Sequence, residues 1–241
     1  MAALVTNGQP PAHECPTVIR FSLIITLFCS CADITPISDG KAYGPVITIQ
    51  DWFTSCYLLK SGDKIILFDA CWRTSALKSG LEANGVAPED VTHVLMTHGH
   101  SDHTGGLALI PQAKVLALRT EQVNLTINAS VHGAIDQTLH DGQEIRLGNH
   151  TITVIAVPGH TPGTAVYWVD GTLILGDAAI TTSTGAIAPA PEGRSKDPKQ
   201  AAESLAELSA RLGRDRLRVD WLVPAHSGGV EGVQPLSDFL P

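Results

Sequence analysis

Apolar runs of strand length dominate the chain after Gly44-Pro45 and form two groups, each followed by a helical pattern. Ser61-Gly62-Asp63 separates two of the early runs and is typical of a hairpin turn. The runs predict a first group of strands at Val46–Ile49, Cys56–Leu59, Ile65–Phe68, Val91–Met96 and Lys114–Leu118, and a second group at Glu144–Leu147, Thr151–Val157, Ala165–Val169, Thr172–Leu175 and Trp221–Val223.

Three helical segments complete the pattern: Ser75–Asn84, which Gly85 ends, Thr120–Asn128 and Pro198–Arg211. Two groups of strands with helices after each predict an α/β (α+β) domain, in which two sheets pack together and the helices lie outside. The segment from Gly185 to Pro198 is rich in Pro and Gly, and we expect a loop there that can border a site.

The bulk composition fits one folded domain. A length of 241 residues suffices for one sizeable core, and 44% hydrophobic with 17% charged residues is typical of a globular chain. The formal net charge of −8 argues against a broad basic surface for nucleic acid. We therefore predict a folded domain over residues 41–241 that binds no nucleic acid. The sequence leaves its oligomeric state open.

The first forty residues are expected to form an extension. Phe21 to Ala32 is uncharged and largely apolar, and it follows Arg20. Its length suits the core of a signal peptide better than a stable membrane span, which needs about 20 apolar residues. We expect export to the periplasm or the medium, with a lipid anchor at Cys31 as a variant. The alternatives are an extra buried strand and a cytoplasmic protein; a native mature chain that retains residues 1–20, shown by intact mass, would exclude export.

The five cysteines contain no Cys-x-x-Cys pair and are odd in number. This spacing indicates neither a zinc knuckle nor a disulfide framework. We expect Cys56 and Cys71 to be small buried hydrophobic residues.

The densest chemistry lies in the run His98-Gly99-His100-Ser101-Asp102-His103. Imidazoles and carboxylates are ligands for zinc, and a solvated polar loop is the alternative. Because side chains alternate along an extended chain, His98 and His100 can point one way while Asp102 and His103 turn toward a second position. The run predicts that one short loop serves two neighbouring metal ions.

Three further segments place a histidine or an aspartate beside Gly or Pro directly after an apolar strand. They are Pro158-Gly159-His160-Thr161-Pro162-Gly163, Leu175-Gly176-Asp177 and Pro224-Ala225-His226. Each alone is a weak signal, because an isolated histidine in such a place is more often an ordinary loop residue. Together with the run they supply seven ligands, enough for two ions. The other five histidines receive no ligand role, and His132 and Trp52 are candidates to line the substrate cleft.

The ligand order, the local sequences and the hairpin-first topology resemble the metallo-β-lactamase superfamily from about Lys41 to the C-terminus. The resemblance implies a four-layer αββα sandwich of two mixed sheets, with the metals at one edge between the sheets. It further implies that His98, His100 and His160 bind a first metal, that Asp102, His103 and His226 bind a second, and that Asp177 bridges them.

Asp69 follows the predicted strand Ile65–Phe68 and matches the family's carboxylate that orients a ligand. The physical logic agrees, since a ligating imidazole needs an acceptor on its other nitrogen. A simple turn residue at a strand end is the alternative.

The resemblance implies hydrolysis by a dinuclear centre of two Zn²⁺, with iron or manganese as alternatives. Two ions that share a water lower its pKa toward neutrality, so metal-bound hydroxide can attack a polarised carbonyl. Asp102 and Asp177 are the predicted catalytic carboxylates, and Asp102 can also accept or pass a proton. The absence of Gly-x-Ser-x-Gly gives a serine mechanism no support. We expect cleavage of a small ester, thioester or lactone.

Departures from subfamily patterns narrow the substrate without fixing it. Asp177 stands where lactamases of the superfamily carry Cys or Ser, and Ile180 stands where N-acyl homoserine lactonases usually carry Tyr. Only fifteen residues follow His226, fewer than the helical region of the glyoxalase II type. β-Lactam and phosphodiester hydrolysis stay open, as do a mononuclear-iron persulfide dioxygenase that uses His98, His160 and Asp177, and a binding module with a decayed site.

Overall fold

The computed structural model describes residues 34–128, 135–191 and 193–238. The chain divides into Met1–Cys31, which lies outside the described residues with most of the predicted signal segment, and Ala32–Pro241. Residues 34–40, which we assigned to the extension, pair with the domain: Thr35 N donates to Thr181 O at 3.0 Å, and Gly228 N donates to Thr35 O at 2.8 Å. Among the described residues, no helix combines the length and the apolar character that a bilayer crossing requires.

Within the described residues, the first sheet has seven strands in the order β1-β2-β3-β4-β5-β6-β7. Neighbours from β1 to β4 run antiparallel, and neighbours from β4 to β7 run parallel. The bounds are β1 Ala42–Tyr43, β2 Val46–Asp51, β3 Thr54–Ser61, β4 Lys64–Phe68, β5 Val91–Leu95, β6 Lys114–Leu118 and β7 Gln137–Leu139.

The second sheet has six described strands in the order β15-β14-β11-β10-β9-β8, with β11 and β14 parallel and the other pairs antiparallel. Strands β12 and β13 form a separate small hairpin. The bounds are β8 Glu144–Leu147, β9 His150–Ala156, β10 Ala165–Val169, β11 Thr172–Gly176, β12 Ile180–Thr181, β13 Ile187–Ala188, β14 Trp221–Pro224 and β15 Val230–Glu231.

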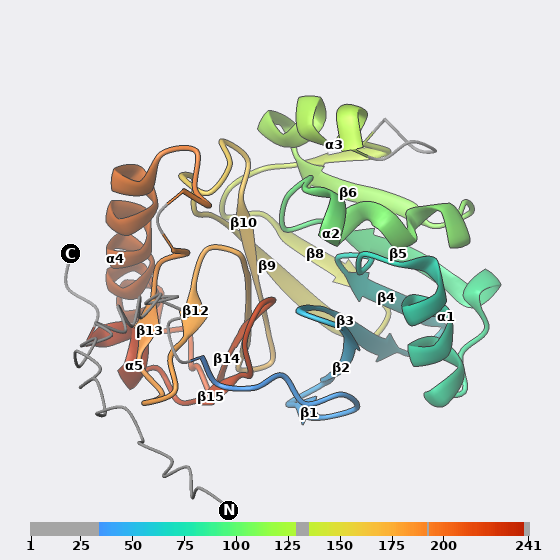
Figure 1. Cartoon of the computed structure of the whole chain (residues 1–241), viewed down its shortest axis with the longest axis horizontal. Helices are drawn as coiled ribbons and strands as arrows, with labels where there is room; N and C mark the ends of the chain where they lie inside the picture. The colour runs from blue at the N-terminus through green and yellow to red at the C-terminus, as the bar shows by residue number, and fades with distance from the viewer. Residues whose placement is uncertain (1–33, 129–134, 192, 239–241) are drawn as a thin grey trace, which may run out of the picture. The chain divides into compact units, whose positions relative to one another are not determined.

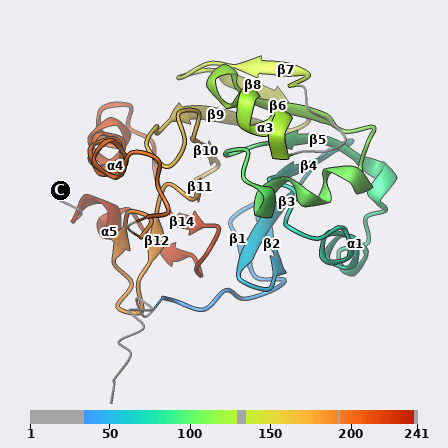
Figure 2. The same cartoon turned by 45° about the horizontal axis from the view of Figure 1, so that its top comes forward.

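Helices lie on the two outer faces of the paired sheets, with α1 against the first sheet and α4 against the second (Figure 1). The turned view separates the layers, with α4 and α5 on one side and α1 on the other (Figure 2). The bounds are α1 Thr74–Ala83, η1 Pro88–Asp90, α2 Ser101–Thr104, η2 Gly105–Leu109, η3 Arg119–Glu121, α3 Gln122–Asn128, α4 Pro198–Arg214 and α5 Gln234–Ser237. The expected four-layer αββα sandwich of two mixed sheets is confirmed.

Alternation along β3 shows how the layers arise from the sequence. Tyr57 and Leu59 point into the core between the sheets, where they join Phe68 and Tyr167, whereas Leu58 points into the core beneath α1. Side chains on successive strand residues face opposite sides of the sheet, so one apolar strand contributes residues to two hydrophobic cores. This explains why Cys56–Leu59, in the middle of β3, form an unbroken apolar run.

Every strand and helix that the pattern predicts is present, with ends shifted by a few residues. The short elements were missed, namely β1, β7, β12, β13, β15, α2 and α5. Two-residue strands carry too few positions to show a period. The predicted Gly185–Pro198 loop contains β13, which pairs with β12 through Ile180 and Ala188.

Cys56 and Cys71 are buried as predicted, but the prediction that they are only small hydrophobic residues was wrong, because they form a disulfide. The pairing of Tyr57 with Phe68 brings the end of β4 beside β3, and positive φ angles at Asp69 and Cys71 turn the chain back over that strand. The two Cα atoms then lie 5.1 Å apart despite a separation of 15 residues. Disulfides persist in oxidising compartments, which agrees with export, although export itself stays a prediction.

Replacing both cysteines, Cys56→Ala with Cys71→Ala, should lower the free energy of unfolding by about 3 kcal/mol, the loop-closure value for about 15 residues. For a domain of this size, that corresponds to a fall in Tm of roughly 6–12 °C. Thermal denaturation measures the change, with fully reduced wild type as the control. A double variant as stable as the oxidised wild type would contradict a stabilising bond.

Candidate metal centre

All eight predicted site residues lie at one edge of the paired sheets, just beyond strand ends. Because β4 and β5 are parallel neighbours, as are β11 and β14, their carboxyl ends meet at this edge. The first sheet contributes the segments after β4 and β5 together with α2, and the second contributes the segments after β9, β11 and β14. The residues brought together are Asp69, His98, His100, Asp102, His103, His160, Asp177 and His226.

Three histidines converge in a first cluster. His98 Nε2 and His160 Nε2 lie 3.2 Å apart, and each lies 3.0 Å from His100 Nδ1. Asp177 Oδ2 approaches the same group, at 3.3 Å from His160 Nε2. The four side chains offer one donor atom each within 4.8 Å of one another. The arrangement matches the predicted first site.

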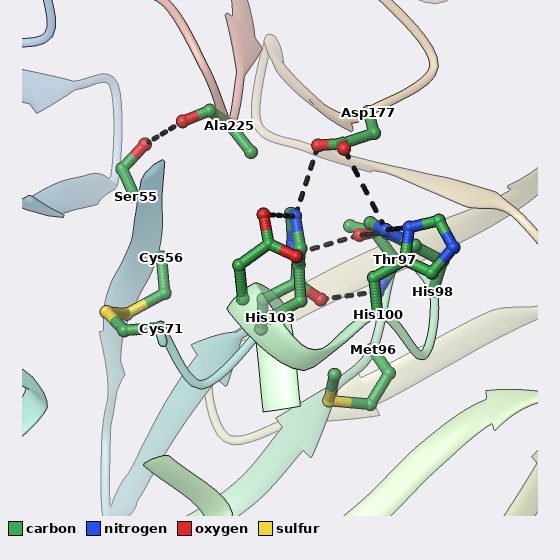
Figure 3. Close-up of polar contacts among 12 residues, drawn as sticks. Ser55, Cys56, Cys71, Met96, Thr97, His98, His100, His103, Asp177 and Ala225 are labelled. Carbon is green, nitrogen blue, oxygen red and sulfur yellow. Dashed lines mark hydrogen bonds and ion pairs between the residues drawn. A yellow bond between two sulfur atoms is a disulfide. The ribbon is translucent and has the colours of Figure 1, made fainter. Parts of the chain in front are cut away.

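Asp102, His103 and His226 form a second cluster on the same edge. Asp102 Oδ2 lies 3.2 Å from His226 Nε2 and 3.7 Å from His103 Nε2. Asp177 reaches this group as well, with Oδ1 at 3.2 Å from His103 Nε2 and Oδ2 at 3.1 Å from His226 Nε2. Figure 3 shows Asp177 facing His103 and His98 across the cluster. One carboxylate therefore touches both groups, as a bridging ligand must.

Neighbouring acceptors fix the orientation of three imidazoles. Asp69 Oδ2 lies 2.8 Å from His103 Nδ1, and the Phe53 carbonyl lies 2.8 Å from His226 Nδ1. Thr97 Oγ1 donates to Asp69 Oδ2 at 2.7 Å, so it can only accept from His98 Nδ1, 3.1 Å away. In each case Nδ1 carries a hydrogen, which leaves Nε2 as the atom that can bind a metal ion in the cluster. Asp69 lies where the predicted orienting role requires, against Nδ1 of His103, and the role itself stays a prediction.

The two clusters differ in protonation in the metal-free protein. Burial, assisted by the charge of His103, lowers the pKa of His98 well below its usual range, and burial lowers the pKa of His160 to about 4. Burial acts the same way on His226, but its hydrogen bonds to Asp102 and Asp177 outweigh it and raise the pKa to about 10. Burial is likewise outweighed at His103, whose pKa the charges of Asp177 and Asp69 raise.

The donor set fits zinc. Within the described residues, His103 Nε2 and Asp177 Oδ1 are buried and close together, yet neither makes a hydrogen bond. Apart from ion pairs with side chains of the cluster itself, neither atom has a polar partner in the described part of the chain, and a bound cation would satisfy both. Tetrahedral zinc with Zn–N bonds of about 2.0–2.1 Å places its ligand nitrogens about 3.3 Å apart, close to the 3.0–3.2 Å spacing of the first cluster. The site therefore suits metal ions with imidazole and carboxylate ligands.

Three exposed aromatic rings border the second cluster. Trp52 is 68% exposed, Phe53 43% and Trp72 37%. The ring of Phe53 stacks on His226 at 5.6 Å, and the rings of Trp52 and Trp72 stack on each other at 5.9 Å. We call Trp52, Phe53 and Trp72 the aromatic wall.

Hydrogen bonds to Asp51 and the disulfide connect the two segments that carry the aromatic wall. The buried Asp51 carboxylate accepts hydrogen bonds from Trp72 N and from Arg73 N and Nε, and the disulfide joins β3 to the residue before Trp72. Two segments distant in sequence are thus tied together beside the cluster.

Some site residues were missed from the sequence. Trp52 was a candidate for the cleft, but Phe53 and Trp72 were not, and neither were Thr97 and Glu121. Thr97 directly precedes His98, so its position was the available signal. Glu121 lies in the predicted helix Thr120–Asn128, and nothing in the sequence distinguished it from a surface acid. His132, the other cleft candidate, lies outside the described residues.

A sandwich of two mixed sheets with a histidine and aspartate cluster at the sheet edge defines a class of metal-binding αββα proteins. The family model of the metallo-beta-lactamase superfamily matches residues 49–226. The chain belongs to the metallo-beta-lactamase superfamily, and the resemblance drawn from the ligand motifs is confirmed.

Two curated relatives illustrate the similarity. A hydroxyacylglutathione hydrolase from Anaeromyxobacter dehalogenans (strain 2CP-C) is 33% identical over 176 residues, which cover 73% of this chain and 61% of that protein. Metallo-beta-lactamase domain-containing protein 1 from Homo sapiens is 33% identical over 162 residues, covering 64% and 54%. The chain therefore spans less than two thirds of the length of these relatives.

Solved structures share the fold. A B3 metallo-beta-lactamase with an active site glutamic acid aligns with a TM-score of 0.64 at 18% identity, over 86% of this chain and 88% of that chain. A beta-lactamase from Chitinophaga pinensis aligns with a TM-score of 0.60 at 24% identity, over 85% and 83%. At such identities the similarity concerns the fold alone.

Proposed function

We propose that the protein is a dinuclear zinc hydrolase that cleaves a small ester, thioester or lactone. The observation that carries the proposal is the position of Asp177, which lies within 3.3 Å of ligand nitrogens from both clusters. A shared carboxylate favours two adjacent ions over one. Bound zinc would supply an activated water and polarise the carbonyl group of the substrate.

The chain's own residues then have distinct tasks. His98, His100 and His160 would hold one ion, and Asp102, His103 and His226 the other. Asp102 keeps 22% of its side chain exposed, the same range as His226, so this pair lies at the open side of the centre. A carboxylate in that place can take a proton from the incoming water and pass it to the leaving group.

The relatives support the bond type. The hydroxyacylglutathione hydrolase carries a thioesterase activity in its name, and its similarity covers 73% of this chain. The aromatic wall supports an apolar substituent on the substrate, because exposed rings beside a reactive centre gain free energy by covering apolar surface. We therefore favour acyl groups with an aryl or extended apolar part.

A hydrolysis panel tests the proposal. Zinc-loaded protein is assayed by pH indicator against lactones, aryl esters, thioesters, phosphodiesters and a β-lactam, with a chelated sample as the control. Chelator-sensitive turnover of an ester, thioester or lactone is the expected result. Activity confined to phosphodiesters or to the β-lactam would overturn the substrate class, and turnover unaffected by chelation would overturn the metal mechanism.

Trp72→Ala should raise KM for a phenyl-substituted ester by about 2- to 12-fold, because losing one aromatic contact costs roughly 0.5–1.5 kcal/mol. The rate constant kcat should change little, since the Trp72 ring packs against Trp52 and Phe53 and not against a proposed ligand. An acetyl ester is the control, and its KM should stay constant. Equal effects on both substrates would show that the aromatic wall does not contact the acyl substituent.

A further inference from the structure

Glu121 is a buried acid that the mechanism above does not use. It lies where η3 meets α3, directly after β6, and it is fully buried. Burying a carboxylate away from water is costly unless hydrogen bonds compensate it. The identity of its partners therefore shows what the carboxylate does.

Both oxygens of Glu121 accept two hydrogen bonds each. Oε1 accepts from Gly99 N at 2.8 Å and from Asn124 Nδ2 at 2.7 Å. Oε2 accepts from Thr161 Oγ1 at 2.8 Å and from Gly163 N at 3.1 Å. Gly99 stands between His98 and His100, and Thr161 directly follows His160. One carboxylate thus joins the two loops that carry the three histidines of the first cluster.

The close packing of both loops on residues 121–125 is independent evidence that this segment holds the two loops together. A Cβ atom on Gly99 would lie 2.7 Å from Leu125 N, and one on Gly163 would lie 2.6 Å from Glu121 N. Real Cβ atoms do not come so close to backbone, so neither loop can bear a side chain there. The glycines let both ligand loops approach the Glu121 segment directly.

We propose that Glu121 is a positioning residue for the first metal site. It clamps the His98-Gly99-His100 loop to the His160 loop and so fixes the distance between their imidazoles. The inference rests on the metal binding in the proposed function, but on no particular substrate. Its role parallels that of Asp69 at His103, except that Glu121 acts through loop backbones.

Glu121→Gln tests the clamp with little change of shape. The amide NH₂ group of glutamine can donate but cannot accept a hydrogen bond. Whichever carboxylate oxygen it replaces, the donors that faced that oxygen lose their acceptor, and one of the two ligand loops loses its hydrogen bonds to residue 121. The affinity for the first zinc equivalent should fall about 10–100-fold, the usual range for groups that hold metal ligands. The readouts are competition with a chromophoric chelator and the visible spectrum of the Co²⁺-loaded protein, whose bands report ligand geometry.

Ser61→Ala is the matched control. Ser61 is buried, accepts from Asn149 N and His150 N, and donates to Leu147 O, but it lies at the other end of β3 from Phe53. The Ser61→Ala protein should have a lower Tm than the wild type, with unchanged zinc affinity and an unchanged Co²⁺ spectrum. A Glu121→Gln protein with lowered Tm but wild-type zinc affinity and spectrum would overturn the proposal, because its role would then be structural only.

Thr161→Val decides the case if Glu121→Gln does not fold. It removes the hydroxyl bond from the His160 loop to Glu121, together with the contact of that hydroxyl with Thr164 in the same loop, and keeps the branched shape. A several-fold weaker first zinc equivalent supports the clamp, and unchanged affinity overturns it. A wild-type chain that binds no zinc would overturn the proposed function and the clamp together, whereas zinc binding without turnover in the panel would overturn only the hydrolase proposal.

Discussion

Asp177→Asn is expected to lower kcat by at least about 10²–10³-fold, the scale on which one charged group at a reaction centre acts. Asp177 is the only described carboxylate within 3.3 Å of ligand nitrogens in both clusters, so the amide weakens both sites at once. Turnover and zinc content per chain, measured on the same purified sample, check the expectation. Zinc content should fall below two equivalents.

Asp102→Asn is the matched comparison for Asp177→Asn. Asp102 contacts only His103 and His226, so its amide should release one zinc equivalent and leave the first site filled. If Asp177→Asn retained two zinc equivalents and full turnover, the bridging role would be wrong. If both variants lost both metals, the two sites would depend on each other more strongly than the geometry indicates.

Asp69→Asn should weaken the second zinc site by about 10–100-fold, the usual cost of losing a group that orients a metal ligand. Asp69 accepts from Thr97 N, Thr97 Oγ1 and His103 Nδ1, and an amide can replace only one of its two oxygens as an acceptor. Activity should therefore be low at limiting zinc and recover at high zinc. A zinc titration of turnover measures both.

Asp51→Asn is the control that distinguishes an effect of Asp69 on the orientation of His103 from a general loss of stability. Asp51 is also a buried carboxylate with three N–H donors, but they belong to Trp72 and Arg73 rather than to a ligand. Its amide should lower Tm to a similar extent while the zinc dependence of turnover stays at the wild-type value. Identical zinc dependence in the Asp69 and Asp51 variants would refute the orienting role of Asp69.

The sandwich was predictable because its strands are long, apolar and separated by clear turn residues. The clustering of the candidate histidines was predictable because their segments follow such strands, and strand ends of parallel neighbours meet at one edge. Asp177 was found in the same way. The site residues that could be predicted are therefore those whose place follows from their position just after a predicted strand.

The rest of the site depends on contacts between distant segments. Glu121 became significant only once Gly99 and Gly163 were seen on either side of it. The aromatic wall required Trp72 to lie beside Trp52, and that contact follows from the turn at Asp69, whose φ of 59° no sequence period predicts. The disulfide was missed for the same reason.

The candidate metal centre combines residues from both sheets: His98, His100, Asp102 and His103 follow β5, whereas His160, Asp177 and His226 follow strands of the second sheet. Bound zinc would therefore cross-link the two sheets of the sandwich. Each tenfold rise in free zinc above the dissociation constant adds about 1.4 kcal/mol to the free energy of unfolding. The zinc supply around the protein would then govern its lifetime as a folded chain as well as its rate of turnover.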